Sequence, residues 1–254
     1  MKIVVITQND PFYLAENLNY LIDILPKHSK IIGCVVADVS PFGKKESFFK
    51  KAKKTYDIFG LNFFMYYAFQ FLISKLNPKK NVFNVLKKNK ISPIILNEPI
   101  NNPISVKKIK AFKPDLLISI LGNQIFKDPI LNLAPKGCLN LHTSLLPKYR
   151  GLMPTFWVLK NSEKKTGVSV FYVDNGIDSG PIIVQKEVVI GNKTQQQLIS
   201  FTKRLGMKAI AESVDLIEND KVALIENDSN KKSYFTFPTR EDVKIFRAKG
   251  KRFF

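Results

Sequence analysis

The sequence predicts an α/β fold with a mostly parallel sheet flanked by helices. A buried strand at 2–7, a helix after it and a second strand at 31–37 form a strand–helix–strand opening, which is typical of parallel sheets. Strands and helices continue to alternate along the chain. With 254 residues, 45% of them hydrophobic, the chain is long enough for one large domain or for one domain with a small appendage.

The first helix is expected to begin at Asp10-Pro11, because Asp can cap a helix and Pro suits its first turn. Apolar residues at helical spacing follow and end at Pro26. The segments up to residue 121 are then expected as a basic helix at 81–90, a strand at 91–96, a helix at 106–112 and a strand at 115–121. No Gly-x-Gly-x-x-Gly follows the first strand, so we expect no dinucleotide site there.

A Lys-rich stretch from 44 to 54 leads into an aromatic segment at 59–76. This segment is near the length of a membrane span, but Asn62, Gln70 and Ser74 interrupt it, so we expect no stable membrane insertion. It is either a buried helical insertion or a surface helix that meets a partner, an acceptor or a membrane face. We favour burial, because large aromatic side chains usually belong to the core.

The second half continues the α/β pattern. We expect a short helix from Asp128-Pro129, strands at 137–142, 168–173 and 182–190, and helices at 153–161 and 194–219. An extended segment at 233–240 and a basic helix at 241–249 follow. The chain therefore divides into a domain at 1–219 and a C-terminal extension at 220–254 that packs on it.

Cysteine and histidine are too few to suggest a metal site. Cys34 and Cys138 lie in apolar, strand-like runs and are expected to be reduced core thiols. His28 and His142 are the only histidines, which argues against a His-based metal centre. The N-terminus lacks the layout of a signal peptide, so we expect a cytoplasmic protein.

The net charge of +19 could attract tRNA, nucleotide phosphates or an anionic membrane face. Lys far outnumbers Arg, and Asn, Ile and Phe are plentiful, as in proteins from AT-rich genomes. We favour this compositional explanation, because charge alone speaks to association and not to chemistry.

Three polar residues form a candidate catalytic group. Asn140 and His142 are two apart on a predicted strand and therefore point to the same side of it. They lie near the carboxyl end of that strand, where open α/β sheets bind ligands. Asp178 follows in the turn at 175–180. An amide, an imidazole and a carboxylate can serve acyl transfer as oxyanion donor, acid/base and orienting anion.

The order and spacing of these motifs resemble the folate-dependent formyltransferase family. The hallmark is Asn-x-His, then a Ser-Leu-Leu-Pro-x-x-x-Gly loop, here at 144–151, then an Asp 36 residues after the His, as from His142 to Asp178. Segments 166–170 and 176–183 fit as well, and the close match covers roughly 114–190. The family includes glycinamide ribonucleotide, methionyl-tRNA and sugar-nucleotide formyltransferases.

The resemblance implies a Rossmann-like formyltransferase core that moves the formyl group of 10-formyltetrahydrofolate to a primary amine, without a metal. It assigns the catalytic roles to Asn140, His142 and Asp178. It places the folate pocket at Asn123, Gln124, Ile125, Val173, Asp174, Asn175, Gly176 and Ile177. Gln124 stands where several relatives carry Arg, so its own role stays open. Acceptor contacts are expected at Ser144, Lys148, Tyr149 and Arg150, although a solvated basic loop is the alternative.

Three acceptors compete in this interpretation. We rank a nucleotide-linked amino sugar first, because the chain is compact and carries aromatic groups that could stack a base or sugar. Methionyl-tRNA suits the basic charge and comes second, since the roughly 35 residues after 219 are too few for a β-rich tRNA-binding domain. Glycinamide ribonucleotide comes third. A binding module that kept only the fold is the non-enzyme alternative. We expect no DNA partner and leave a homodimer open.

Overall fold

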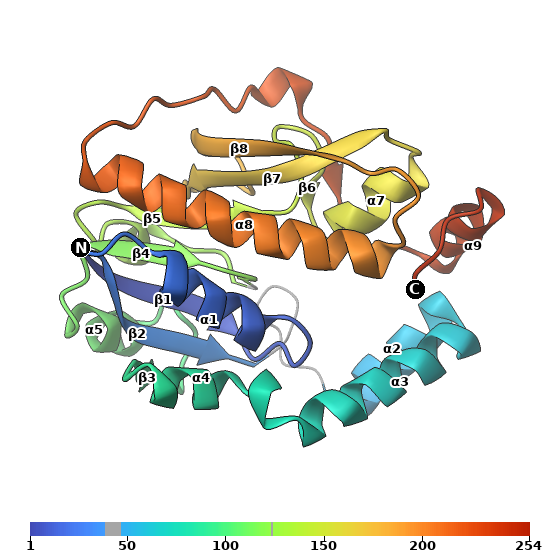
Figure 1. Cartoon of the computed structure of the whole chain (residues 1–254), viewed down its shortest axis with the longest axis horizontal. Helices are drawn as coiled ribbons and strands as arrows, with labels where there is room; N and C mark the ends of the chain where they lie inside the picture. Colours follow the sequence, from blue (N-terminus) through green and yellow to red (C-terminus); the bar gives the residue numbers. More distant parts are fainter. Residues whose placement is uncertain (39–46, 123) are drawn as a thin grey trace.

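The computed structural model describes residues 1–38, 47–122 and 124–254. Part of the Lys-rich stretch and Asn123, expected in the folate pocket, lie outside the described residues. The rest forms layers of helices on a twisted sheet (Figure 1).

The sheet has the order β3-β2-β1-β4-β5-β7-β8 in the described residues. Its strands are β1 (Lys2–Gln8), β2 (Lys30–Ala37), β3 (Ser92–Ile94), β4 (Leu116–Ser119), β5 (Cys138–His142), β7 (Lys165–Tyr172) and β8 (Ile182–Val189). The pairs from β3 to β5 are parallel, while β7 is antiparallel to both β5 and β8. This confirms the predicted α/β class with a mostly parallel sheet.

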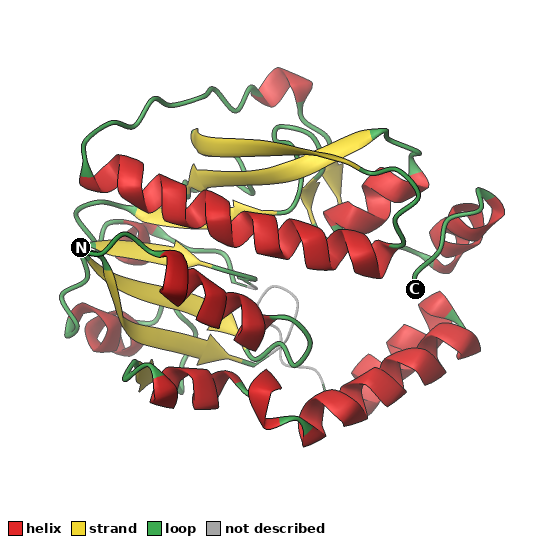
Figure 2. Ribbon diagram, in the orientation of Figure 1, coloured by secondary structure: helices red, strands yellow, loops and turns green. Residues whose placement is uncertain are grey.

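Helices cover both faces of the sheet, as the red ribbons of Figure 2 show. The described α-helices are α1 (Leu14–Ile24), α2 (Phe48–Phe59), α3 (Leu61–Leu76), α4 (Val82–Lys88), α5 (Pro103–Lys110), α6 (Asp128–Leu131), α7 (Pro154–Lys160), α8 (Gln195–Glu218) and α9 (Arg240–Ala248). On β1, Ile3 and Val5 face the core of α1, α4 and α8, whereas Val4 and Ile6 face that of α5 and α6. This alternation follows from the two-residue period of a strand.

Capping side chains fix the N-terminal ends of α1 and α8. The Asp10 carboxylate accepts hydrogen bonds from the backbone N–H groups of residues 12–14, so it caps α1 although the regular helix begins at Leu14. Thr194 and Gln197 form a capping box on α8, which ends at Asn219. The predicted helix at 194–219 is therefore confirmed.

The expectation that the aromatic segment is buried was wrong. Ser74 is the one buried residue of α3, and its large side chains Leu61, Met65, Phe69 and Leu72 are all exposed. The segment is part of a hairpin of α2 and α3 at the edge of the molecule (Figure 1). Composition favoured burial, but the hairpin has apolar residues on more sides than one packing contact can cover.

The C-terminal residues return to the rest of the chain. Strand β9 (Tyr234–Phe235) pairs in parallel with β6 (Arg150–Gly151), a segment expected as a loop. Phe246 of α9 is fully buried and stacks on Phe156 of α7, with ring centroids 5.0 Å apart. None of the described helices is both long and apolar enough to cross a bilayer.

Candidate active site

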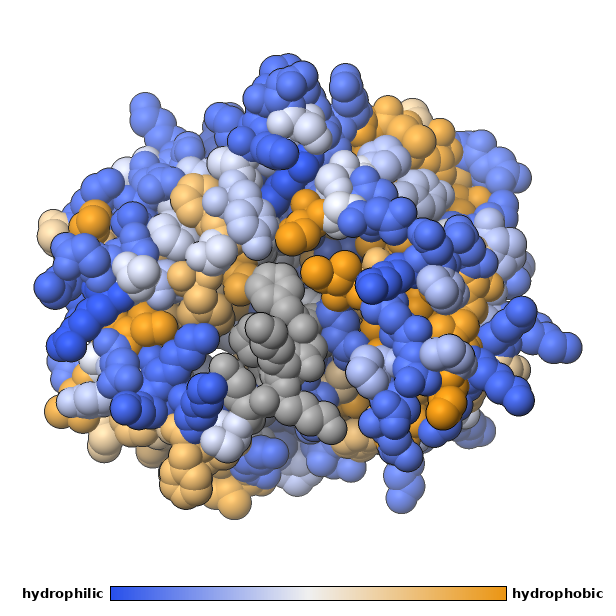
Figure 3. Space-filling view, turned by 180° about the vertical axis from the view of Figure 1, so that it is seen from behind, coloured by the Kyte–Doolittle hydropathy of each residue, from blue (hydrophilic) through white to orange (hydrophobic). Residues whose placement is uncertain are grey.

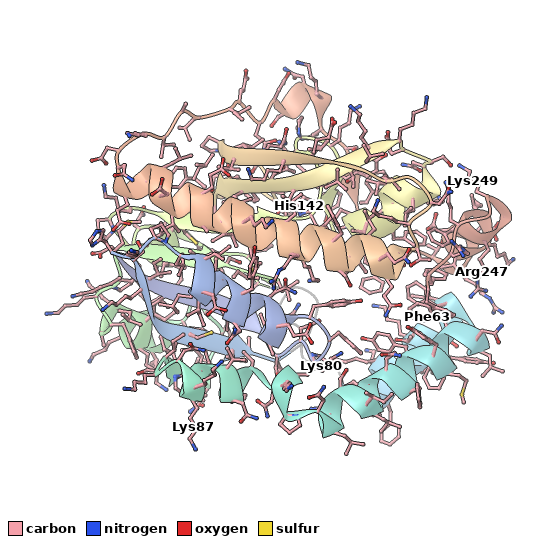
Figure 4. All side chains as sticks on the ribbon, viewed as in Figure 1. Phe63, Lys80, Lys87, His142, Arg247 and Lys249 are labelled. Carbon is pink, nitrogen blue, oxygen red and sulfur yellow. The ribbon has the colours of Figure 1, made fainter. Side chains whose placement is uncertain are left out.

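Strand β5 carries two polar side chains to its carboxyl end. Asn140 lies beside Ser119 of β4 and Phe171 of β7, and His142 lies beside Ser169 of β7. Both residues therefore lie where the parallel part of the sheet gives way to the antiparallel part. Figure 4 shows His142 near the middle of the molecule. His142 is buried, and Asn140 is partly buried.

Asp178 meets both side chains from the loop between β7 and β8. Its Oδ2 lies 3.5 Å from His142 Nδ1, and its Oδ1 accepts a 3.5 Å hydrogen bond from the Asn140 amide. The backbone N–H of Gly151 also donates to Oδ2 at 2.8 Å. The structure thus brings together the three side chains that the sequence predicted as catalytic.

The other ring nitrogen of His142 also faces an oxygen. Its Nε2 lies 2.7 Å from the backbone carbonyl of Tyr149. Because a carbonyl only accepts, Nε2 must carry a hydrogen for this contact to be a hydrogen bond. With the Asp178 carboxylate near Nδ1, both nitrogens face acceptors, an arrangement that suits an imidazole that takes up and returns a proton.

Hydrogen bonds hold the loop after β5 beside this group. Ser144 is fully buried, and its hydroxyl donates to the carbonyl of Lys148 at 2.9 Å. Ser169 donates to the carbonyl of Ser144 at 2.7 Å and accepts from the N–H of Leu146 at 3.1 Å. These contacts explain the Ser-Leu-Leu-Pro segment as a scaffold for the Tyr149 carbonyl and the Gly151 N–H.

A pocket of about 550 Å³ opens over the three polar side chains. Of the predicted folate residues that the structure describes, its walls include Gln124, Ile125, Val173, Asp174, Gly176 and Ile177. Asn175 is exposed and does not line it. The side-chain oxygen of Gln124 accepts a 2.9 Å hydrogen bond from the backbone N–H of Ile100. This side chain therefore also links its loop to the segment around Ile100.

The residues predicted to contact the acceptor lie outside this pocket. Lys148 is exposed, whereas Ser144, Tyr149 and Arg150 are buried. The Arg150 guanidinium donates to the side-chain and backbone oxygens of Asn227 at 2.8 and 3.1 Å. Tyr149 donates to Glu163 at 2.6 Å. The side chains of Ser144, Tyr149 and Arg150 thus hydrogen-bond to other residues of the chain and do not line the pocket.

Sequence reasoning missed several residues that line the pocket. Lys54 and Tyr67 reach it from α2 and α3, and Lys203 reaches it from α8. Phe237 also lines it, and it belongs to the aromatic tail that the sequence suggested as an acceptor wall or as a tie to the core. Burial lowers the pKa of Lys203, while Asp10 acts in the opposite direction. Only the Lys-rich and aromatic composition hinted at them, because their approach depends on contacts between segments far apart in sequence.

The arrangement is suited to acyl transfer. Asn140 has an amide N–H to offer a developing oxyanion, and His142 with Asp178 can move a proton. Among the described residues, no cluster of three or more His, Cys, Asp or Glu side chains could hold a metal ion. The walls combine apolar side chains with loop backbone, which fits a flat, polar-edged ring system.

Both the sequence and the fold are similar to those of known proteins. The model of the formyl transferase family matches residues 71–214, more than half of the chain. A methionyl-tRNA formyltransferase of Alkaliphilus oremlandii is 36% identical over 154 residues, which are 60% of this chain and 50% of that protein. The chain thus spans about half the length of the curated relatives it matches.

Two solved structures illustrate the shared fold. An N-formyltransferase from Helicobacter canadensis, in complex with folinic acid and dTDP-3-aminofucose, has a TM-score of 0.60 at 20% identity and covers 95% of this chain and 72% of its own. A phosphoribosylglycinamide formyltransferase from Anaplasma phagocytophilum has a TM-score of 0.63 at 16% identity and covers 94% and 99%. At these identities the likeness concerns the fold alone.

Proposed function

The chain belongs to the formyl transferase family, and on that premise we propose that it moves a formyl group from 10-formyltetrahydrofolate to a primary amine. The observation that carries this proposal is the convergence of Asn140, His142 and Asp178 on one wall of the 550 Å³ pocket. An amide donor, a proton carrier and an anion are the groups that acyl transfer to an amine requires.

Each of the three side chains has a distinct part in this reaction. A bond forms between the amine nitrogen and the formyl carbon, the bond from that carbon to the folate nitrogen breaks, and the proton lost by the amine goes to that nitrogen. The Asn140 amide stabilises charge on the formyl oxygen. His142 carries the proton, and Asp178, 3.5 Å away, orients its ring and stabilises the imidazolium form.

The donor would occupy the part of the pocket formed by the loops after β4 and β7. Ile125, Val173 and Ile177 provide apolar contacts, and the neighbouring backbone provides donors and acceptors for a pterin ring. The bound folate supplies the activated formyl group. What the chain itself contributes is the placement of that group against Asn140 and the exclusion of bulk water.

For the acceptor, we propose a nucleotide-linked amino sugar. Lys54 and Lys203 can hold phosphates, and Tyr67 and Phe237 can stack on a base or sugar. The Helicobacter canadensis structure contains an acceptor-type molecule of this class, dTDP-3-aminofucose, which supports the proposal by analogy.

Methionyl-tRNA is the second candidate. The net charge of +19 favours a polyanionic partner. The relative from Alkaliphilus oremlandii is a methionyl-tRNA formyltransferase, which supports this candidate by analogy. Glycinamide ribonucleotide ranks third, and a binding module without activity is the remaining alternative, against which the intact catalytic group argues.

The test is a formyl-transfer assay with the purified protein and 10-formyltetrahydrofolate. Separate reactions contain a panel of amino-sugar nucleotides, initiator methionyl-tRNA or glycinamide ribonucleotide. We expect formylated product with one or more sugar nucleotides and none with His142→Ala. Efficient formylation of tRNA alone would replace the sugar acceptor, and the absence of product from every acceptor would overturn formyl transfer itself.

A further inference from the structure

Among the described residues, the α2–α3 hairpin is joined to the C-terminal segment through one side. Gly60, at φ +81°, turns the chain between the two helices, and the Arg247 guanidinium donates to the Phe59 carbonyl at 2.7 Å. Phe63 stacks on Phe59 with ring centroids 4.5 Å apart, and Tyr66 stacks on Phe254 at 4.0 Å. In Figure 4, Phe63 and Arg247 lie at this inner side of the hairpin.

The opposite side of α3 carries a continuous apolar stripe, which we call the outer stripe. It consists of Leu61, Met65, Phe69, Leu72 and Leu76, each between 58% and 83% exposed. Their spacings of four, four, three and four residues place them on one face of the helix, over a length of roughly 22 Å. Phe48 and Phe49 at the start of α2 add two further exposed rings, 65% and 82% accessible.

An apolar surface of this kind is unusual on a protein that stays free in water. Single exposed apolar residues need no explanation, but an aligned row of five does. In Figure 3, tan and orange side chains emerge among blue ones at the lower left, the side on which α2 and α3 lie in that reversed view. The stripe therefore marks a binding surface.

The charges around the stripe identify its partner. Residues 47–80 contain seven lysines, of which Lys51 and Lys54 line the pocket, but a single acidic residue, Asp57. Lys75 and Lys79 are exposed at the end of α3, and Lys87 on the neighbouring α4 points away from the body of the molecule (Figure 4). A row of apolar side chains flanked by lysines is the pattern of helices that lie in the interface of an anionic membrane.

Two other partners fit less well. A second copy of the chain would bring its own charge of +19 and the same lysines against this surface, which opposes association through the stripe. A nucleic acid would match the lysines but would leave the apolar stripe uncovered, because its outer surface is phosphate.

We propose that the outer stripe and its flanking lysines bind an anionic membrane surface, with α3 lying in the plane of the interface. The apolar side chains enter the boundary between headgroups and acyl chains, and the lysines reach the headgroup phosphates. The inner side of the same hairpin contributes Thr55, Phe59 and Tyr67 to the pocket wall. Binding in this way places the pocket close to the membrane surface.

The first test is cosedimentation of the full chain with phosphatidylcholine vesicles, with and without phosphatidylglycerol. We expect binding to the anionic vesicles, weaker binding at high salt and little binding to the neutral ones. Phe69→Asp should lower the vesicle partition coefficient on the order of tenfold or more. The matched control is Ile104→Asp on α5, because Phe69 and Ile104 are both 59% exposed.

The second test separates local charge from total charge. Lys79→Glu should weaken binding to anionic vesicles severalfold more than Lys107→Glu on α5, although both exposed lysines change the net charge equally. Circular dichroism and thermal unfolding check that each variant is folded. Equal binding of Phe69→Asp and Ile104→Asp, or no binding to anionic vesicles, would overturn the proposal. A dimer seen by light scattering that Phe69→Asp dissociates, without vesicle binding, would assign the stripe to a second copy.

Discussion

Asn227 holds the backbone of Asp178. The Asn227 amide donates to the Asp178 carbonyl at 3.0 Å and to the Gly180 carbonyl at 2.9 Å, and its own oxygens accept from the Arg150 guanidinium. Asp178 has φ +48°, a conformation that costs energy in a residue with a side chain. The C-terminal segment therefore supports the turn that aims the Asp178 carboxylate at His142.

Asn227→Ala should loosen this turn. Asn227 is buried, so the change removes two hydrogen bonds to carbonyls and the side-chain oxygen that accepts from the Arg150 guanidinium, and it leaves Arg150 with the backbone carbonyl of residue 227. We expect a loss of about 1–3 kcal/mol in the free energy of unfolding, together with a fall in kcat. Urea unfolding and turnover measurements check both effects. Asn230→Ala, at an exposed position nearby, is the control and should leave both quantities unchanged.

His142→Ala and Asp178→Asn should each abolish most of the activity without unfolding the protein. The first change removes the proton carrier, and the second removes the charge 3.5 Å from its Nδ1. A loss on the order of 10²-fold or more in kcat is expected, as for other acid/base and oxyanion partners. Turnover is measured at saturating substrates with folding followed by circular dichroism. Near-normal kcat in both variants would remove these residues from the mechanism.

Local patterns predicted the part of the site that local structure builds. Asn140 and His142 share a strand face, and Asp178 follows in a turn whose residues are close in sequence. The same holds for α8, whose capping residues Thr194 and Gln197 are three apart in the sequence. The shared strand face and the helix caps depend on near neighbours, so periodicity and capping residues carry that information. The pairing of Asp178 with His142 and Asn140 joins residues 36 and 38 positions apart, and it was predicted from the resemblance to the formyltransferase family.

Long-range contacts account for what could not be predicted. The sequence suggested Arg150 as a cation that could bind a phosphate. In the structure Arg150 is buried, and Asn227, 77 residues away, accepts its hydrogen bonds. Nothing near Lys203 in sequence indicates that it faces the pocket. The outer stripe of α3 has the composition of a core helix, and only the tertiary structure shows that α3 packs through the opposite face.

Lys203→Met should separate stability from binding. In the folded protein Lys203 is half-buried, and burial lowers its pKa because the charged form loses solvation. Its replacement by Met should raise the free energy of unfolding by roughly 1 kcal/mol or less, since solvent screens part of the cost. It should also raise the KM for a phosphorylated acceptor roughly tenfold, as for a lost charge-assisted contact. Lys208→Met, exposed on the same helix, controls for the change in charge.

Alkaline pH should destabilise the protein through its buried thiols. Burial raises the pKa of Cys34 from 9.0 to about 12 and raises that of Cys138 as well. Above pH 9 the unfolded chain loses protons that the folded protein keeps, so this stability is present below pH 9 and is lost as the pH rises towards the folded pKa values. Each thiol should cost about 1.4 kcal/mol per pH unit in this window.

Urea unfolding at about pH 8 and about pH 10.5 measures the effect, and we expect the free energy of unfolding to fall by about 2–4 kcal/mol between them. Burial and the hydrogen bond to Glu163 raise the pKa of Tyr149 to about 12, which adds to the loss above pH 10. The free energy of unfolding of Cys34→Ala should fall less steeply with pH than that of the natural protein, because the change removes one of the two thiols. Identical slopes for the two proteins would show that Cys34 does not contribute to the alkaline loss.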